Sequence, residues 1–407
     1  MITFKSWQSI APALESRNFR LFWLGQIVST IGTSLQVVAE GWLIYQITQS
    51  TFWLGMVGLI GLLPVVPIAL LGGILIDKVP RRKLIMVTQA GLLLQAAVFG
   101  LLALSGEIQL WHIILLYFIF GSLLAIDHPA RRAFLVELVD ETALANAVAL
   151  NASVFNTSTL IGFTFSGLLI AAIGAGGTML LNAATYLVPI TALALIRVAD
   201  VGQDKQKRPL ATALVAGFRA LGQQPGILAA ISLMAVVGGL TVPLFGLMPA
   251  LAEDVLHTGA VGLGALMATG ALGSLVGTAV VAQLGQQQRG RTMLIAGLLL
   301  PAFIVGVATA SNMITAGLFL LAAGLVLLLL QSLAITVVQL HIADQVRGRV
   351  MSLYSMVHAG SDTMGTAFIG GIAVHLGLPL ALALGGMIAL VYTLLLWVIF
   401  PAMRHLD

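Results

Sequence analysis

The chain has 407 residues, of which 59% are hydrophobic and only 8% are charged, and its formal net charge is +4. A water-soluble protein carries about 25% charged residues, so this composition excludes a soluble domain and indicates that lipid is the solvent. The absence of cysteine excludes disulfides, thiolate nucleophiles and cysteine-based metal sites.

Twelve apolar runs follow one another along the chain, and each can cross the hydrocarbon layer as a helix of about 20 residues. The runs are 20–47, 52–76, 84–104, 111–127, 147–172, 178–197, 226–247, 262–283, 293–310, 313–337, 351–374 and 380–401. The segment before the first run lacks a signal-peptide pattern, so the first helix is expected to be retained. The sequence therefore predicts an all-α integral membrane protein with twelve transmembrane helices.

The basic residues fall on one side of this predicted topology. If both termini are cytoplasmic, the inner segments contain all 19 lysines and arginines, and the outer loops contain none. Such a division follows the positive-inside rule. It predicts a multi-pass protein of the bacterial inner membrane with both termini in the cytoplasm, and it gives no indication of nucleic-acid binding.

An internal repeat divides the chain into two halves. Gly162, Phe165, Gly167 and Gly174 recur at an offset of 203 residues, as Gly365, Phe368, Gly370 and Gly377. The repeat predicts two pseudo-symmetric six-helix bundles, 1–197 and 226–407, joined by a polar cytoplasmic linker at 198–225. Two equivalent bundles can rock about a site between them, so the repeat favours transport by alternating access.

The loop after the second helix carries a recognisable charged motif. It resembles the signature loop of the major facilitator superfamily, although Pro80 replaces the usual second glycine. The residues that match the signature are Gly73, Leu75, Asp77, Lys78, Arg81 and Arg82. The resemblance implies the major facilitator fold and a cytoplasmic gate formed by these charges.

Three further segments are similar to the branch of that superfamily that contains macrolide and siderophore exporters. They are Asn18-Phe19-Arg20, Pro129-Ala130-Arg131-Arg132, and Arg347-Gly348-Arg349. The resemblance implies export of a small, often amphipathic molecule. The gate is predicted to include further charged residues: Asp127 with Arg131 and Arg132, and Arg347 with Arg349. The alternatives are that these residues form a plain solvated helix end, or that the charges serve only to set the topology.

Ionisable residues within the predicted spans are few, and such residues are retained in lipid where they face a cavity or a partner. Glu40 stands 20 residues beyond the start of its run, about 30 Å along the axis, and is predicted to line an outward cavity. His358 and Asp362 are four residues apart and share one helix face. These three residues are candidates for proton coupling. The alternative for Glu40 is a carboxylate near the interface that water reaches, and the alternative for His358 and Asp362 is a pair that serves packing alone.

Uncharged polar residues also occur within the runs. They can bind a substrate or can hydrogen-bond neighbouring helices. The candidate substrate-binding residues are Gln36, Asn151, Asn156 and Gln331.

The predicted function is therefore secondary active export of a small amphipathic molecule by proton-coupled antiport, with a multidrug, macrolide or siderophore as substrate. The core lacks basic residues, which favours a substrate that is not anionic. Lysophospholipid transport is the alternative on the same fold, and a receptor or enzyme the alternative of another class. No enzyme motif, nucleotide loop or metal-ligand spacing occurs in the sequence, so no enzymatic activity, cofactor or metal is predicted. The predicted partners are the substrate, the coupling proton and the lipid bilayer. The chain is expected to be a monomer.

Overall fold

The computed structural model describes residues 12–65, 67–68, 79–197, 224–283, 288–342 and 344–405. These residues form helices joined by short turns, and no strand occurs among them. Backbone groups in lipid have no water to bond, so a chain this apolar satisfies them within helices. The all-α prediction is confirmed.

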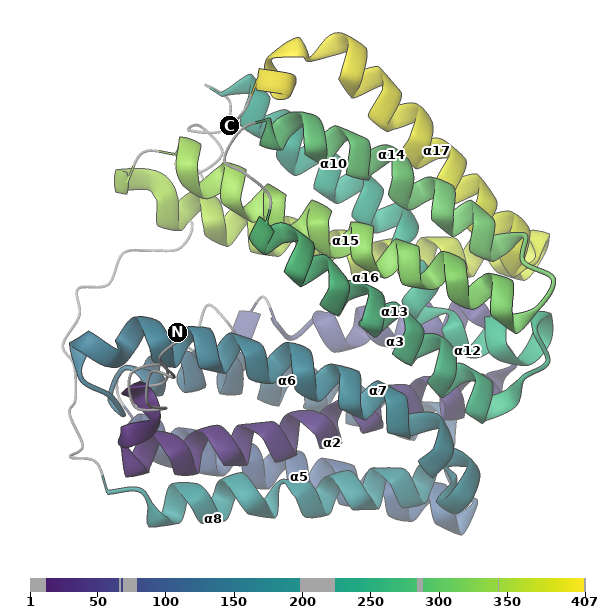
Figure 1. Cartoon of the computed structure of the whole chain (residues 1–407). Helices are drawn as coiled ribbons and strands as arrows, with labels where there is room; N and C mark the ends of the chain where they lie inside the picture. Colours follow the sequence, from purple (N-terminus) through teal and green to yellow (C-terminus); the bar gives the residue numbers. More distant parts are fainter. Residues whose placement is uncertain are drawn as a thin grey trace, which may run out of the picture. The chain divides into compact units, whose positions relative to one another are not determined.

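The chain divides into two compact units. The first unit comprises Met1–Leu43 and Ile60–Gln206. Its elements are η1 Pro12–Glu15, most of α2 Arg17–Thr48, α5 Arg81–Ser105, α6 Leu110–Leu135, α7 Glu141–Thr185 and α8 Leu187–Leu195. Figure 1 shows these helices as long rods that run along one another.

The second unit comprises Ile44–Leu59 and Lys207–Asp407. It contains most of α3 Thr51–Leu62 together with α10 Pro225–Thr241, the short α11 Pro243–Gly246 and α12 Met248–Ala250, the π-helix η2 Leu251–Val255, α13 Gly259–Gln283, α14 Arg289–Ala308, α15 Met313–His341, α16 Asp344–Leu376, α17 Leu378–Ile399 and η3 Pro401–His405.

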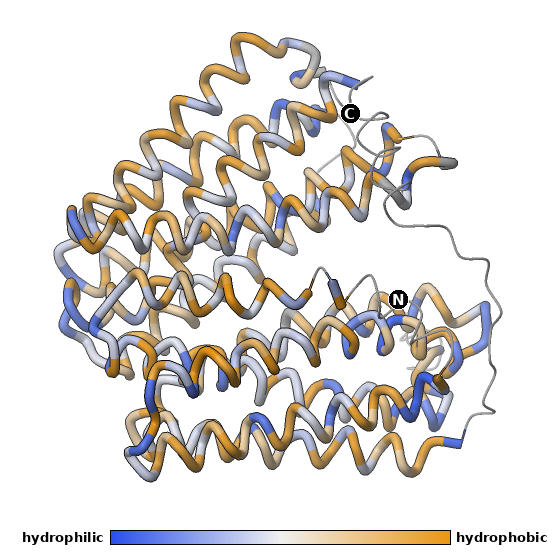
Figure 2. Tube along the Cα trace, turned by 180° about the vertical axis from the view of Figure 1, so that it is seen from behind, coloured by the Kyte–Doolittle hydropathy of each residue, from blue (hydrophilic) through white to orange (hydrophobic). Residues whose placement is uncertain are grey.

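Nine helical stretches in the described part are long and apolar enough to cross a membrane. One of them, Glu141–Leu195, is 55 residues long and is broken at Gly174, so it supplies two spans. The short apolar α3 and the more polar α16 complete the twelve predicted helices. Figure 2 shows apolar residues along the helices and polar residues concentrated near their ends, as lipid requires.

The repeat is visible in the backbone of each unit. Gly174 has φ 73° and ψ 169°, and Gly377 has φ 80° and ψ 151°. A positive φ is strained for residues with a Cβ and is readily adopted by glycine. Each of these glycines therefore ends one span and starts the next in the same way, at matched positions of the two halves.

Matched glycines also let helices cross closely in each unit. A Cβ on Gly162 of α7 would lie 2.5 Å from Ser34 Cβ of α2. A Cβ on Gly365 of α16 would lie 1.8 Å from the Gly239 carbonyl oxygen of α10. Small residues at these crossings bring the backbones together, which is how membrane helices gain packing energy when lipid supplies no hydrophobic drive.

Residues 44–59, which the sequence places in the first bundle, pack with the second unit. The Thr51 hydroxyl donates a buried hydrogen bond of 2.8 Å to the Gly370 carbonyl. A Cβ on Gly55 would lie 2.5 Å from Ala367 Cα. Close contacts through small residues therefore attach this segment of the N-terminal half to α16.

The crossing of α13 and α15 gives a direct test of the packing. We expect Gly324→Ala to lower the midpoint of thermal unfolding in detergent, because its Cβ would lie 2.1 Å from the Gly270 carbonyl oxygen. Overpacking costs about 1–3 kcal/mol, more than the ~0.5–1 kcal/mol that alanine gains over glycine in a helix. Gly317→Ala on the same helix is the control, since its nearest neighbour would be 3.8 Å away. Equal midpoints for the two variants would contradict the crossing.

Candidate functional site

Glu40 lies in the interior of the first unit and is fully buried. One turn earlier on α2, the Gln36 Nε2 donates a hydrogen bond of 2.6 Å to Glu40 Oε1. Glu40 Oε2 has no hydrogen-bond partner among the described residues, and Tyr117 of α6 lies beside the carboxylate. The structure thus encloses a carboxyl group whose Oε1 accepts an N–H group of Gln36 and whose other neighbours are the Gln95 amide and the Tyr117 hydroxyl.

Two further helices bring amides to Gln36. Its Nε2 also donates to Gln95 Oε1 of α5 at 3.1 Å, and its Oε1 accepts from Asn182 Nδ2 of α7. Gln36 and Asn182 are fully buried, and Gln95 is 3% exposed. Four side chains from three helices therefore form one buried polar chain, which we call the Glu40 network: Glu40, Gln36, Gln95 and Asn182.

A glycine makes room for this network. A Cβ on Gly32 would lie 2.2 Å from both Asn182 Oδ1 and Thr185 Oγ1. Along the same seam, the Thr33 hydroxyl and the Tyr186 hydroxyl are 3.0 Å apart. Helices α2 and α7 can therefore approach closely enough for their polar groups to bond.

Asp127 is the second fully buried acid of the first unit. Its Oδ2 is 2.5 Å from Arg131 Nε on the same face of α6. Its Oδ1 accepts from the Thr88 hydroxyl at 2.6 Å and from Gln89 Nε2 at 3.0 Å, both on α5. The arginine continues to α2, where its Nη1 donates to Gln26 Oε1 at 2.9 Å. This cluster is a buried, charge-paired junction of three helices.

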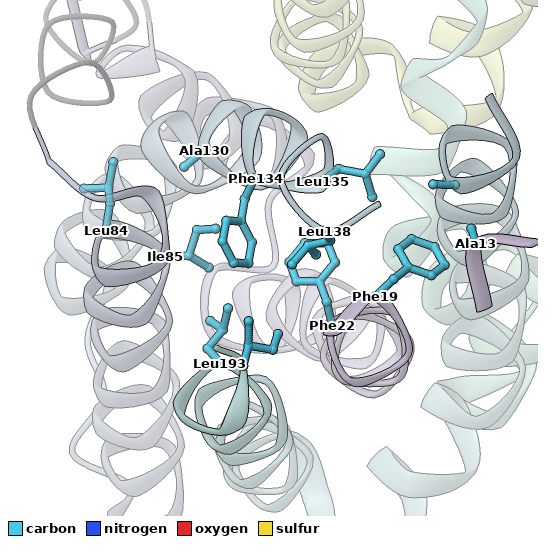
Figure 3. Packing of buried hydrophobic residues seen from close by; sticks show 12 residues of the cluster. Ala13, Phe19, Phe22, Leu84, Ile85, Ala130, Phe134, Leu135, Leu138 and Leu193 are labelled. Carbon is cyan, nitrogen blue, oxygen red and sulfur yellow. The ribbon is translucent and has the colours of Figure 1, made fainter. Parts of the chain in front are cut away.

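Apolar residues surround the junction on its α8 side. A small cavity of about 10 Å³, enough for one water molecule, is lined by Gln26 and Arg131 among apolar side chains. The Phe22 and Phe134 rings pack edge to face with centroids 5.6 Å apart. Figure 3 shows these rings with Ile85 and Leu193 in one packed cluster. The low-dielectric surroundings strengthen the ion pair and make each unpaired charge costly.

Part of the predicted gate motif lies within the described residues. Arg81 Nη1 is 2.5 Å from Glu137 Oε1 and 3.2 Å from the Ala133 carbonyl oxygen. Arg82 donates to the Ala194 carbonyl at 3.2 Å. These bonds tie the start of α5 to α6 and α8. Gly73, Asp77 and Lys78 fall outside the described residues.

The other predicted gate residues are more peripheral. Arg132 is exposed. The Arg347 guanidinium donates to the Ile342 carbonyl at 3.4 Å, at the start of α16. The side chain of Arg349 lies outside the described part of the chain. Their role in gating stays a prediction.

In the second unit the structure brings His358 and Asp362 together. His358 Nδ1 is 3.2 Å from Asp362 Oδ2, and about a quarter of each side chain is exposed. Tyr354, one turn earlier, is 3% exposed, and its ring centroid is 6.1 Å from that of His358. Glycine at 238 leaves room for Asp362, since a Cβ there would lie 3.1 Å from Oδ1. The pair is thus accessible at the seam between α10 and α16.

The remaining predicted substrate-binding residues lie apart from these clusters. Asn151 on α7 and Gln331 on α15 are half-buried. Asn156 belongs to α7, and its side chain is outside the described part. Their contact with a substrate stays a prediction, as does that of Gln36.

Sequence reasoning missed the partners that come from other helices. Gln95, Tyr117 and Asn182 join Glu40 and Gln36, while Thr88 and Gln89 join Asp127. A usable signal existed for two of them, because Gln89 and Gln95 are polar residues inside a long apolar run. Among the described residues, no group of three histidines or acids has a geometry suited to a metal ion.

The chain is similar in sequence to known membrane exporters. Enterobactin exporters match over nearly the whole chain: that of Escherichia coli is 25% identical over 401 residues, 95% of this chain and 92% of its own. That of Salmonella paratyphi A is 26% identical over 403 residues, 95% of this chain and 93% of its own. The chain is therefore related to these exporters along its full matched length.

Solved structures share the fold at low identity. A POT family transporter in complex with 5-aminolevulinic acid has a TM-score of 0.74 at 13% identity, covering 95% of this chain and 97% of its own. A bacterial homolog of the human lysosomal transporter Spinster, inward-facing and occupied, has a TM-score of 0.72 at 14% identity, covering 96% and 98%. A family model described as transmembrane secretion effector matches residues 8–407. The chain belongs to that family, a branch of the major facilitator superfamily of membrane transporters.

Proposed function

We propose that this transporter exports a small amphipathic molecule of the siderophore class, in exchange for protons. The observation that carries the substrate class is the full-length relationship to the enterobactin exporters. The likeness to solved transporters, at 13–14% identity, concerns the fold and does not favour another cargo.

Proton exchange is proposed at Glu40. A carboxyl group held fully inside a membrane bundle costs several kcal/mol when it is charged and is retained for a function. Its Oε2 accepts no N–H group, so this oxygen has a position for a proton. His358 and Asp362 are a second proposed exchange site, because they are paired and accessible on α16.

The basic residues support an orientation for this export. They lie in the segments that the positive-inside rule assigns to the cytoplasm, so both termini are proposed to be cytoplasmic. Substrate is then taken up from the cytoplasm or the inner leaflet and released outside. Apart from Arg20 and Arg197 at the ends of two runs, the predicted spans contain no lysine or arginine, which favours a substrate, or a substrate form, without net negative charge.

Inside-out membrane vesicles test the proposal directly. With enterobactin as the probe and an imposed acidic interior, we expect uptake into vesicles that contain the protein, above the level of vesicles without it. A protonophore should abolish the difference. Uptake of a lysophospholipid or a macrolide, with no uptake of enterobactin, would contradict the siderophore class. Enterobactin uptake that is insensitive to the pH gradient would contradict proton exchange.

A further inference from the structure

We propose that Asn182 is a positioning residue that sets, through the Gln36 amide, which oxygen of Glu40 carries the exchanged proton. The inference rests on the proposed role of Glu40. It assigns Gln36 to the proton site, whereas the sequence predicts that this residue binds substrate. It also gives Asn182 and Gln95 roles that their sequence positions do not reveal.

Both N–H groups and the oxygen of the Gln36 amide are hydrogen-bonded to neighbouring side chains. Its two N–H groups are used by Glu40 Oε1 at 2.6 Å and Gln95 Oε1 at 3.1 Å. Its oxygen accepts from Asn182 Nδ2. An amide has two donors on one side and an acceptor on the other, so the Asn182 bond decides that the donor side faces Glu40.

Asn182 is itself held in one orientation. The Thr185 hydroxyl is 2.9 Å from Asn182 Oδ1 and 2.7 Å from the Asn182 carbonyl oxygen. The hydroxyl shares its one proton between these two oxygens, so the Oδ1 side of the asparagine faces Thr185 and its NH₂ group faces Gln36 on α2. Gly32 leaves room for both side chains. The donors therefore point in one direction, from Thr185 through Asn182 and Gln36 to Glu40.

Gln95 closes the other side of the site. Its Oε1 accepts from Gln36, and its Nε2 donates to the Leu116 carbonyl of α6 at 3.4 Å. Rotation of the Gln95 amide would place two donors against each other, which is unfavourable in a buried site. The network thus has a single consistent set of donors and acceptors.

The consequence for Glu40 follows from this direction. Its Oε1 already receives an N–H group, so a proton on that oxygen would face a donor. Its Oε2 receives no N–H group, and the Tyr117 hydroxyl beside the carboxyl can accept a hydrogen bond, so Oε2 takes the proton. The side chains recorded around the carboxyl are uncharged amides from α2 and α5 and Tyr117 from α6, of which only Tyr117 can titrate.

The test is the proton affinity of Glu40 in the purified full-length protein in bilayers. The infrared carbonyl band of the protonated acid, identified by its loss in Glu40→Gln, is followed as the pH is raised. In Asn182→Leu the Gln36 amide is free to turn its oxygen to Glu40, which removes the donor that favours the ionised form. We expect the midpoint of the band to move to higher pH by about one unit, a tenfold change in proton affinity.

Thr178→Val is the matched control. Thr178 is buried on the same helix, one turn before Asn182, and its hydroxyl bonds only the Gly174 carbonyl of its own helix among the recorded partners. Its midpoint is expected to equal that of the wild type. Gln36→Leu should show the same shift as Asn182→Leu, and the double variant no larger shift, because one residue acts through the other.

Two results would overturn the inference. The first is an Asn182→Leu midpoint equal to that of Thr178→Val. The second is a full additional shift when Asn182→Leu is added to Gln36→Leu, which would show action by another route. Asn182→Ser replaces the leucine variant if the latter does not fold. Proton-driven transport that persists in Glu40→Gln would instead refute the proposed exchange of protons at Glu40, whatever the infrared midpoints are.

Discussion

Replacing Glu40 by glutamine is expected to reduce transport driven by a pH gradient to the level of vesicles without the protein. Glutamine has nearly the shape of glutamic acid, yet it neither takes up nor releases a proton between pH 5 and 9. Substrate exchange at equal pH should continue, because the amide keeps the volume of the side chain and can still meet Gln36. The measurement is uptake into inside-out vesicles with and without an imposed gradient.

The same variant makes a prediction about stability. The carboxyl is fully buried among uncharged side chains, and a charge in that position would be costly. We therefore expect the thermal midpoint of Glu40→Gln at neutral pH to be equal to or higher than that of the wild type. A lower midpoint together with lost transport would indicate misfolding and would remove the support for a coupling role.

A matched control separates coupling from charge. Glu253 in η2 is exposed, so Glu253→Gln removes the same formal charge without touching the buried network. Its gradient-driven transport should equal that of the wild type. Equal losses in the two variants would show that the effect of Glu40→Gln comes from net charge and not from its position.

Replacing Arg131 by methionine is expected to have the largest effect on stability. The change leaves the Asp127 carboxylate fully buried without its charged partner at 2.5 Å. Breaking a buried pair by removing one partner costs about 3–5 kcal/mol, because the remaining charge has lost its compensation. The hydrogen bonds from Thr88 and Gln89 remain and offset only part of that cost. The measurement is the thermal midpoint in detergent at neutral pH.

The double variant tests whether the cost comes from the orphaned charge. Asp127→Asn combined with Arg131→Met removes both charges and should recover much of the stability lost in Arg131→Met. Arg132→Met is the control, since it removes the same charge at the next residue, where the side chain is exposed. A midpoint for Arg131→Met close to that of Arg132→Met would contradict a buried ion pair at this junction.

The sequence alone determined the features that depend on one helix or on the bilayer. The length of an apolar run is set by the thickness of the hydrocarbon layer, so the twelve helices could be counted before any contact was known. Asp127 with Arg131, and His358 with Asp362, could be paired because residues four apart share a helix face. The turn at Gly174 and Gly377 could be matched because the repeat preserves its spacing.

Only the tertiary structure decided which helices meet. Gln36 shares α2 with Glu40, but Gln95, Tyr117 and Asn182 come from α5, α6 and α7, and no spacing within α2 specifies them. The approach of α2 to α7 depends on Gly32, whose effect appears only when Asn182 lies opposite. The same holds for residues 44–59, which belong to the predicted first bundle in sequence and pack with the second unit in space. In lipid the hydrophobic effect does not sort helix faces, so close packing and hydrogen bonds choose the neighbours.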